Sequence, residues 1–127
     1  MTEKLLFALL AIALVSTTAI AAEDDDCEEI GKLVAMMTYG KEHCPSFELS
    51  SNGETALVNL YARVGLLGGS TCMDKGGRAM MEQLPIHSGE LLRALASGNQ
   101  ARVEQALCIA IPRYLRKVSP LIMAPGN

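Results

Sequence analysis

Four cysteines constrain the fold of this chain more than any other feature of its sequence. Cys27, Cys44, Cys72 and Cys108 all follow an N-terminal apolar segment in a chain of 127 residues. An even number of cysteines in a short exported chain favours a framework of disulfides. Without residues 1–22 the chain has about 105 residues, the size of one domain with a modest core. Two covalent cross-links would therefore contribute usefully to its stability.

The N-terminus is predicted to direct export. An unbroken apolar run from Leu5 to Val15 is followed by small and polar residues that end in Ala21 and Ala22, as in a secretory signal. The run is shorter than the roughly 20 apolar residues of a membrane span. We therefore interpret residues 1–22 as a cleavable signal peptide, and expect no stable membrane insertion after cleavage. A retained membrane anchor is the alternative.

Composition favours helices and excludes one class of partner. The chain has no Trp and only 4% aromatic residues, whereas Leu, Ala and Met are plentiful, which disfavours a sandwich or a barrel. The formal net charge is −3, so binding to nucleic acid has no electrostatic support. The chain has no Asn-x-Ser/Thr sequon, which favours a bacterial envelope. We expect a periplasmic or secreted all-α protein.

Helix start and stop signals divide residues 23–119 into a bundle of four to five short helices. Paired glycines at 76 and 77 predict an irregular start to the third helix, and Pro85 is expected to end it. Pro112 is expected to kink or break the last helix. The predicted helices cover residues 26–40, 51–65, 71–85, 88–95 and 99–118, and residues 120–127 are predicted to be a frayed tail.

The C-terminal helix is predicted to be the one on which the others pack. Its apolar residues recur at three- and four-residue steps on one face. Cys108 lies beside this face, where its side chain can reach a neighbouring helix. The residues of the predicted face are Val103, Ala106, Leu107, Ala110, Ile111, Tyr114 and Val118.

Four cysteines allow three pairings, and helix geometry favours one of them. Cys27 and Cys44 flank the first predicted helix, whose length would hold them roughly 20 Å apart, too far for a disulfide. Short connections make successive helices antiparallel, which brings Cys72 back beside Cys27 and places Cys108 near Cys44. The favoured disulfides are Cys27–Cys72 and Cys44–Cys108.

The sequence offers no constellation for catalysis. With two histidines and no nucleophile elbow, phosphate loop or zinc-binding spacing, no hydrolase site assembles. We therefore expect a non-enzymatic protein without a cofactor. The leading hypothesis is a protein-interaction module with an unknown partner, which associates through a helix face.

Two further hypotheses involve small ligands. The first is a carrier of a small apolar ligand between Met- and Leu-rich helices, since flexible apolar side chains suit such a pocket. Its candidate lining residues are Met37, Tyr61, Met80, Met81 and Leu95. The second and more remote hypothesis is a copper site, because two Met pairs are each followed by a His at the same spacing. The residues concerned are Met36, His43, Met80 and His87; filling of the helical core explains the methionines better.

Overall fold

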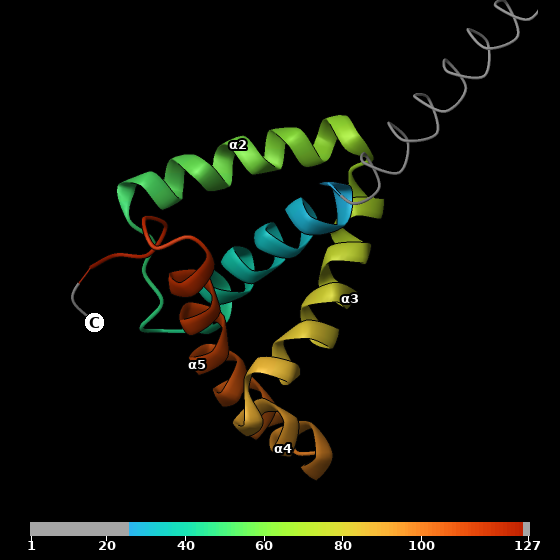
Figure 1. Cartoon of the computed structure of the whole chain (residues 1–127), viewed down its shortest axis with the longest axis vertical. Coiled ribbons are helices and arrows are strands. Elements are labelled where there is room, and N and C mark those ends of the chain that lie inside the picture. The colour runs from blue at the N-terminus through green and yellow to red at the C-terminus, as the bar shows by residue number, and fades with distance from the viewer. Residues whose placement is uncertain (1–25, 126–127) are drawn as a thin grey trace, which may run out of the picture.

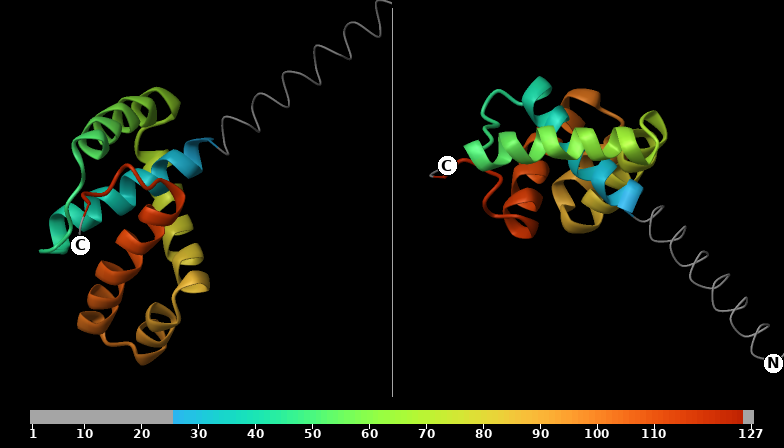
Figure 2. Two further views of the ribbon diagram at one scale, coloured as in Figure 1. Left: turned by 60° about the vertical axis from the view of Figure 1, so that its left-hand side comes forward. Right: turned by 90° about the horizontal axis from the view of Figure 1, so that it is seen from above.

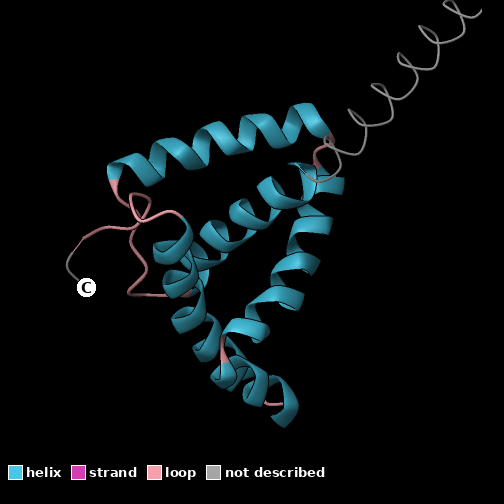
Figure 3. Cartoon of the chain, viewed as in Figure 1, coloured by secondary structure: helices cyan, strands magenta, loops and turns pink. Residues whose placement is uncertain are grey.

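The computed structural model describes residues 26–125, which form five helices joined by short connections (Figure 1). The first helix is described over residues 26–43. It is followed by α2 (Ser51–Leu67), α3 (Ser70–His87), α4 (Gly89–Ser97) and α5 (Gln100–Val118). Figure 3 shows no strand in this part of the chain, so the predicted all-α class is confirmed. The predicted signal peptide, residues 1–22, lies outside the described residues.

The helices form two groups. The first helix and α2 cross each other at one end of the molecule, whereas α3, α4 and α5 form a hairpin that extends away from them (Figure 2). Two-residue and one-residue connections make this geometry compact: Gly68 and Gly69 join α2 to α3, and Ser88 alone joins α3 to α4. Gly68, Gly69 and Gly98 have positive φ angles, which glycine adopts without steric cost.

Both predicted disulfides are present. Cys27 and Cys72 join the first helix to α3, with Cα atoms 4.9 Å apart. Cys44 and Cys108 join the connection after the first helix to the middle of α5, with Cα atoms 5.4 Å apart. The described chain has no free cysteine. The first helix is thus covalently tied at both of its ends to the α3–α4–α5 hairpin.

A contact between two glycines lies one helical turn from the first disulfide. Gly31 follows Cys27 by four residues and Gly76 follows Cys72 by four, so each glycine shares a helix face with its cysteine. A Cβ atom on Gly76 would lie 2.0 Å from the Gly31 carbonyl carbon, and one on Gly31 would lie 2.0 Å from the Cys72 carbonyl oxygen. Only glycine allows the two backbones to approach so closely.

The breaks and early stops predicted for the helices are absent. The first helix continues past Gly40 to residue 43, and α3 is helical across Gly76 and continues beyond Pro85 to His87. The last helix is not broken at Pro112. Buried side chains on both sides of Pro112 anchor α5 in the core, and this packing outweighs one missing backbone donor.

The C-terminal tail is ordered through Ala124, so the prediction of fraying was wrong for most of it. Ile122 and Met123 are buried in the core. Met123 forms an isolated antiparallel bridge with Leu49, and the Ala124 amide donates to the Glu48 carbonyl at 3.0 Å. The prediction failed because it considered only the end of the helix and ignored the apolar residues beyond Pro120.

The core is shared between the first helix and α5. Ile111 and Leu115 of α5 are fully buried, as are Val34, Met36 and Met37 of the first helix. Helix α5 packs on α3 and α4, as predicted, but makes no contact with α2. The apolar face predicted for α5 included Val118 at its C-terminal end, but this residue is half exposed and lies outside the core.

Candidate functional site

A groove lies between the end of α3, the start of α4 and the second half of α5. It has a volume of about 320 Å³, at the lower end of the range for small-ligand sites. We call it the α3–α5 groove. It is lined by Leu84, His87, Ser88, Ala110, Arg113, Tyr114, Lys117 and Val118.

The helical repeat places five of these residues on one face of α5. Ala110, Arg113, Tyr114, Lys117 and Val118 follow each other at steps of three, one, three and one residues, which is two turns of a single face. The buried Ala110 leaves room at the floor of the groove, and the larger side chains form its wall and rim. The apolar pattern that predicted a core-facing helix therefore also supplies the lining of a cavity.

The other wall comes from the junction of α3 and α4. Leu84 is buried and contributes to the apolar floor. His87, one turn later, faces Tyr114 across the groove, with ring centroids 6.2 Å apart. Ser88 is also buried, and its hydroxyl accepts a hydrogen bond from the Leu91 amide at 3.2 Å, which caps α4.

A buried lysine lies behind the groove. Lys32 has a side chain that is only 4% exposed, and its ammonium donates to Gln83 Oε1 at 2.7 Å and pairs with Glu29 at 2.9 Å. The ammonium also lies 5.4 Å from the centroid of the Tyr114 ring, within the range of a cation–π contact. Lys32 therefore supports the aromatic wall of the groove from outside it.

The electrostatic state of Lys32 follows from opposing effects. Desolvation by burial alone would lower the pKa of its ammonium. Hydrogen bonds and charge interactions with Glu29 and Tyr114 together outweigh desolvation, so the pKa is raised above its ordinary value. The side chain is therefore a fixed positive charge at neutral pH.

The residues predicted to line a ligand pocket do not line this groove. Met37 and Met80 are buried in the core and Met81 is partly buried there. Tyr61 on α2 and Leu95 on α4 are exposed. The carrier hypothesis had placed the ligand among the methionines, where packed core side chains lie instead.

The residues predicted for copper lie in separate environments. His43 stacks on Tyr39, with ring centroids 4.6 Å apart, whereas His87 belongs to the α3–α5 groove. Met36 is fully buried in the first helix and Met80 is buried in α3. Within residues 26–125 no group of three or more His, Cys, Asp or Glu side chains is placed to hold a metal ion.

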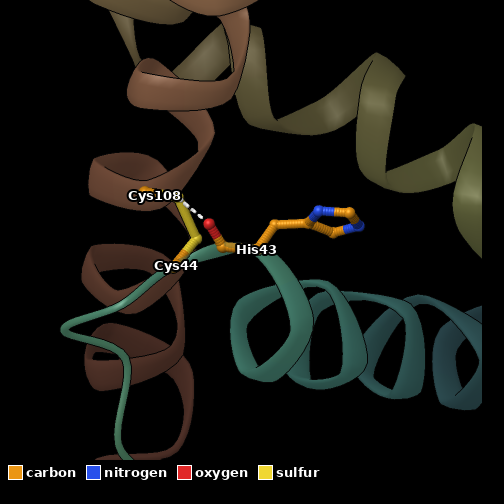
Figure 4. Close-up of a disulfide and its surroundings, with 3 residues drawn as sticks. All are labelled: His43, Cys44 and Cys108. Atoms are coloured by element: carbon orange, nitrogen blue, oxygen red, sulfur yellow. Dashed lines mark hydrogen bonds between the residues drawn. A yellow bond between two sulfur atoms is a disulfide. The ribbon is translucent and has the colours of Figure 1, made fainter.

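Figure 4 shows that the His43 imidazole points away from the neighbouring disulfide. The contact between them involves the backbone, since the Cys108 sulfur lies 3.8 Å from the His43 carbonyl oxygen. A disulfide sulfur carries no proton, so this is a close contact rather than a donated hydrogen bond. His43 therefore adds no redox or metal chemistry to Cys44–Cys108.

A wider hollow lies beside the C-terminal tail. Its volume is about 670 Å³, and residues of the tail make up most of its lining. Arg116 is its single charged residue and no aromatic side chain contributes to it. The α3–α5 groove combines buried floor residues, aromatic rings and several cations, and is the better candidate site.

Sequence reasoning missed the groove because it explained each residue separately. His87 was considered only as a metal ligand, and the last helix only as a core-facing helix. The signal was the alternation of small or apolar residues with cations on one face of the last helix. That pattern differs from an ordinary amphipathic helix, in which cations lie opposite the apolar face.

Comparison of the chain with protein-family models, with curated proteins and with solved structures finds no match. Across residues 26–125, none of the helices combines the length and the apolar character that crossing a membrane requires.

Proposed function

We propose that this protein is a non-enzymatic carrier of a small ligand, which it holds in the α3–α5 groove. The observation that supports this function is a cavity of about 320 Å³ with a buried floor at Leu84 and Ala110 and an aromatic wall at Tyr114. Ligand sites typically combine an apolar lining with a few polar groups that fix orientation. The groove replaces the methionine-lined pocket of the sequence-based carrier hypothesis.

The carrier is proposed to work outside the cytoplasm, in a periplasmic or secreted setting. Two disulfides in a small protein are typical of oxidising compartments. The export signal predicted over residues 1–22 agrees with this location. In a reducing compartment the first helix would lose both of its covalent links to the α3–α4–α5 hairpin.

Binding of a neutral fluorescent probe tests the carrier function. N-phenyl-1-naphthylamine brightens in apolar surroundings, and we expect it to titrate the oxidised protein at a single saturable site. Val118→Asn removes an apolar group from the rim of the groove and should weaken binding several-fold. Val58→Asn is the matched control, because it makes the same change at an exposed position of α2, far along the chain from the groove.

Two results would refute the carrier function. One is the absence of saturable binding. The other is equal weakening by Val118→Asn and Val58→Asn, because it would show that the probe adheres to exposed apolar surface in general.

A second candidate function is protein interaction through the outer face of α2. Val58 and Leu66 on this helix are 68% and 88% exposed, and Tyr61 between them is half exposed. Glu54 and Arg63 are the two charged residues of the helix. Isolated exposed apolar residues are ordinary, but several on one face of a nearly uncharged helix favour a docking surface.

The occupant proposed for this face is a second copy of the chain. Two copies of a nearly uncharged face can pair about a two-fold axis without burying like charges against each other. Sedimentation equilibrium of the wild type should show a concentration-dependent dimer that Leu66→Glu abolishes. Leu92→Glu, at an exposed position of α4, should leave the dimer intact. A monomer at every concentration, or equal effects of both variants, would rule out self-association through α2.

A further inference from the structure

The α3–α5 groove is one-sided in charge. His87, Arg113 and Lys117 are among its lining residues, and no carboxylate is. Within the described residues, Arg113 and Lys117 form no ion pair, whereas Lys32 and Lys41 each pair with a glutamate. Two cations without carboxylate partners therefore lie at the edge of an apolar cavity, in a chain whose formal net charge is negative.

The helix dipole explains only part of this charge. Lys117 lies in the last turn of α5, where a cation offsets the partial negative charge of the helix end. Arg116 lies in the same turn and serves the same role, but it is not part of the groove. Arg113 lies a turn earlier, beyond the short reach of the dipole effect. The helix dipole therefore does not explain why Arg113 lines the groove.

The positions of the two cations suit a single head group. Arg113 and Lys117 are four residues apart on α5, so their side chains emerge side by side on the groove face. A guanidinium presents a planar fork of donors that matches the two oxygens of a carboxylate, and the lysine ammonium adds a point charge. The N-terminus of α4, which carries a partial positive charge, lies at Ser88 on the opposite wall of the groove.

The remaining lining is apolar. Leu84 and Ala110 form a buried floor, and Val118 lies at the rim. The ring of Tyr114 offers a flat surface, and the Lys32 ammonium, which is not among the lining residues, lies 5.4 Å from its centroid and stabilises its position. A ligand that satisfies both parts of the groove carries an anionic head and a short apolar body.

We propose that the ligand of the α3–α5 groove is a small amphipathic carboxylate. Its head lies between Arg113 and Lys117, and its apolar body lies on Leu84, Ala110 and the ring of Tyr114. This inference rests on the proposed carrier function and names the class of ligand. A cavity of about 320 Å³ selects a short body rather than a long acyl chain.

Three probes with the same alkyl chain test the charge preference. Octanoate, 1-octanol and octylamine differ only in the head group, and each is titrated into the oxidised full chain at neutral pH. Backbone amide resonances report both the affinity and the location of binding. We expect octanoate to bind about tenfold or more tightly than 1-octanol, with shifts centred on the groove residues, and octylamine to bind weakest.

A matched pair of arginine variants assigns the head group. Arg113→Gln should reduce octanoate affinity about tenfold or more while leaving 1-octanol unchanged. Arg102→Gln makes the same substitution on α5 at an exposed residue outside the groove. It should change neither the affinity for octanoate nor the affinity for 1-octanol. Added salt should weaken the binding of octanoate but not that of 1-octanol, because salt screens the ion pair between the carboxylate and the two cations.

The outcomes separate the ligand class from the carrier function. Equal affinity for octanoate and 1-octanol in the groove would overturn the carboxylate while leaving a carrier of neutral ligands. A preference for octylamine, or octanoate shifts centred outside the groove, would also overturn it. If none of the three probes shifts the groove residues, both the carboxylate and the carrier function fail.

Discussion

A single methyl group at position 76 would collide with the backbone of the first helix. The closest approach is 2.0 Å, to the carbonyl carbon of Gly31, and backbone atoms cannot move aside as a flexible side chain can. The neighbouring Gly77 lies on the same helix, but a Cβ there would have nothing within 4 Å. Two adjacent glycines thus have opposite roles, which their sequence alone does not distinguish.

We predict opposite effects of alanine at these two positions. Gly76→Ala should lower the free energy of unfolding by about 1–3 kcal/mol or more, because the helices must separate. Gly77→Ala should raise it by about 0.5–1 kcal/mol, because alanine favours the helix. Urea unfolding of the oxidised variants measures both. Equal changes at the two positions would contradict the close contact between Gly31 and Gly76.

Lys32 predicts a loss of stability at alkaline pH. Its pKa is raised in the folded protein, so the folded state binds the proton more tightly than the unfolded chain does. The resulting stabilisation is fully present below the ordinary lysine pKa of about 10.5, and is lost as the pH rises through the higher folded value. Tyr39, whose pKa is raised by burial and by the charge of Glu104, contributes a loss of the same sign.

Lys32→Met isolates the contribution of the lysine. Urea unfolding measured between neutral pH and pH values above about 10.5 should show a shallower alkaline decline in this variant than in the wild type. Lys41→Met, which removes an exposed and paired ammonium, is the control and should keep the wild-type decline. An unchanged slope in Lys32→Met would show that its pKa is the same in the folded and unfolded states.

At the scale of the elements, the sequence predicted each helix well and its ends less well. Periodicity identified all five helices, because each buries an apolar face. Side chains cap the starts of α2, α4 and α5, whereas α3 begins without a side-chain cap. Pro85 was expected to end α3, and the helix continues to His87. The cost of a proline is local, whereas the burial that offsets it comes from helices distant in the sequence. A single sequence shows where the proline is, but it does not show which distant helices bury the residues around it.

The contact of the tail with α2 is another element that local reasoning could not find. The Ser50 hydroxyl caps α2 by accepting from the Gly53 amide at 3.0 Å, and it donates to the tail carbonyls of Leu121 and Ile122. A Cβ on Gly53 would lie 2.1 Å from the Ile122 carbonyl oxygen. The start of α2 and the tail therefore form one structural unit across about seventy residues of sequence.

Ser50→Ala tests this unit. The variant loses the cap and the side-chain hydrogen bonds to the tail but keeps the backbone bond from the Ser50 amide to the Ile122 carbonyl, and we expect the free energy of unfolding to fall by about 1–2 kcal/mol. Hydrogen exchange should accelerate at the amides of Gly53 and Ala124 together. Ser88→Ala, which removes the cap of α4, is the control and should leave exchange in the tail unchanged. Acceleration at Gly53 alone would show that the tail is held independently of Ser50.

At the scale of the whole molecule, the disulfides and the helix contacts fix the first helix against the α3–α4–α5 hairpin. The cysteine pairing followed from helix length and antiparallel order, both of which are visible in the sequence. The Gly31–Gly76 contact could also have been predicted from the sequence, since Cys-x-x-x-Gly occurs at Cys27 and again at Cys72. The α3–α5 groove could not be predicted, because it depends on how three helices converge rather than on any one of them.

The two disulfides are predicted to differ in what they stabilise. Loop entropy alone predicts a slightly larger stabilisation by Cys44–Cys108, because its two cysteines are 64 residues apart in sequence and those of Cys27–Cys72 are 45 apart. Cys72, however, is completely buried beside the glycine contact, so Cys27→Ala/Cys72→Ala also leaves space in the core. We expect each alanine pair to lower the free energy of unfolding by about 2–4 kcal/mol, with the larger loss for the Cys27–Cys72 pair.

Urea unfolding gives the stability, and binding of the neutral fluorescent probe gives the state of the groove. Cys44 and Cys108 connect the first helix to the same α5 that forms the groove, whereas Cys27 and Cys72 lie at the far end of α3 from His87. The Cys44→Ala/Cys108→Ala variant should therefore lose more probe affinity relative to its loss of stability. If the two pairs lose affinity in proportion to stability, the disulfides stabilise the fold as a whole and neither positions the groove.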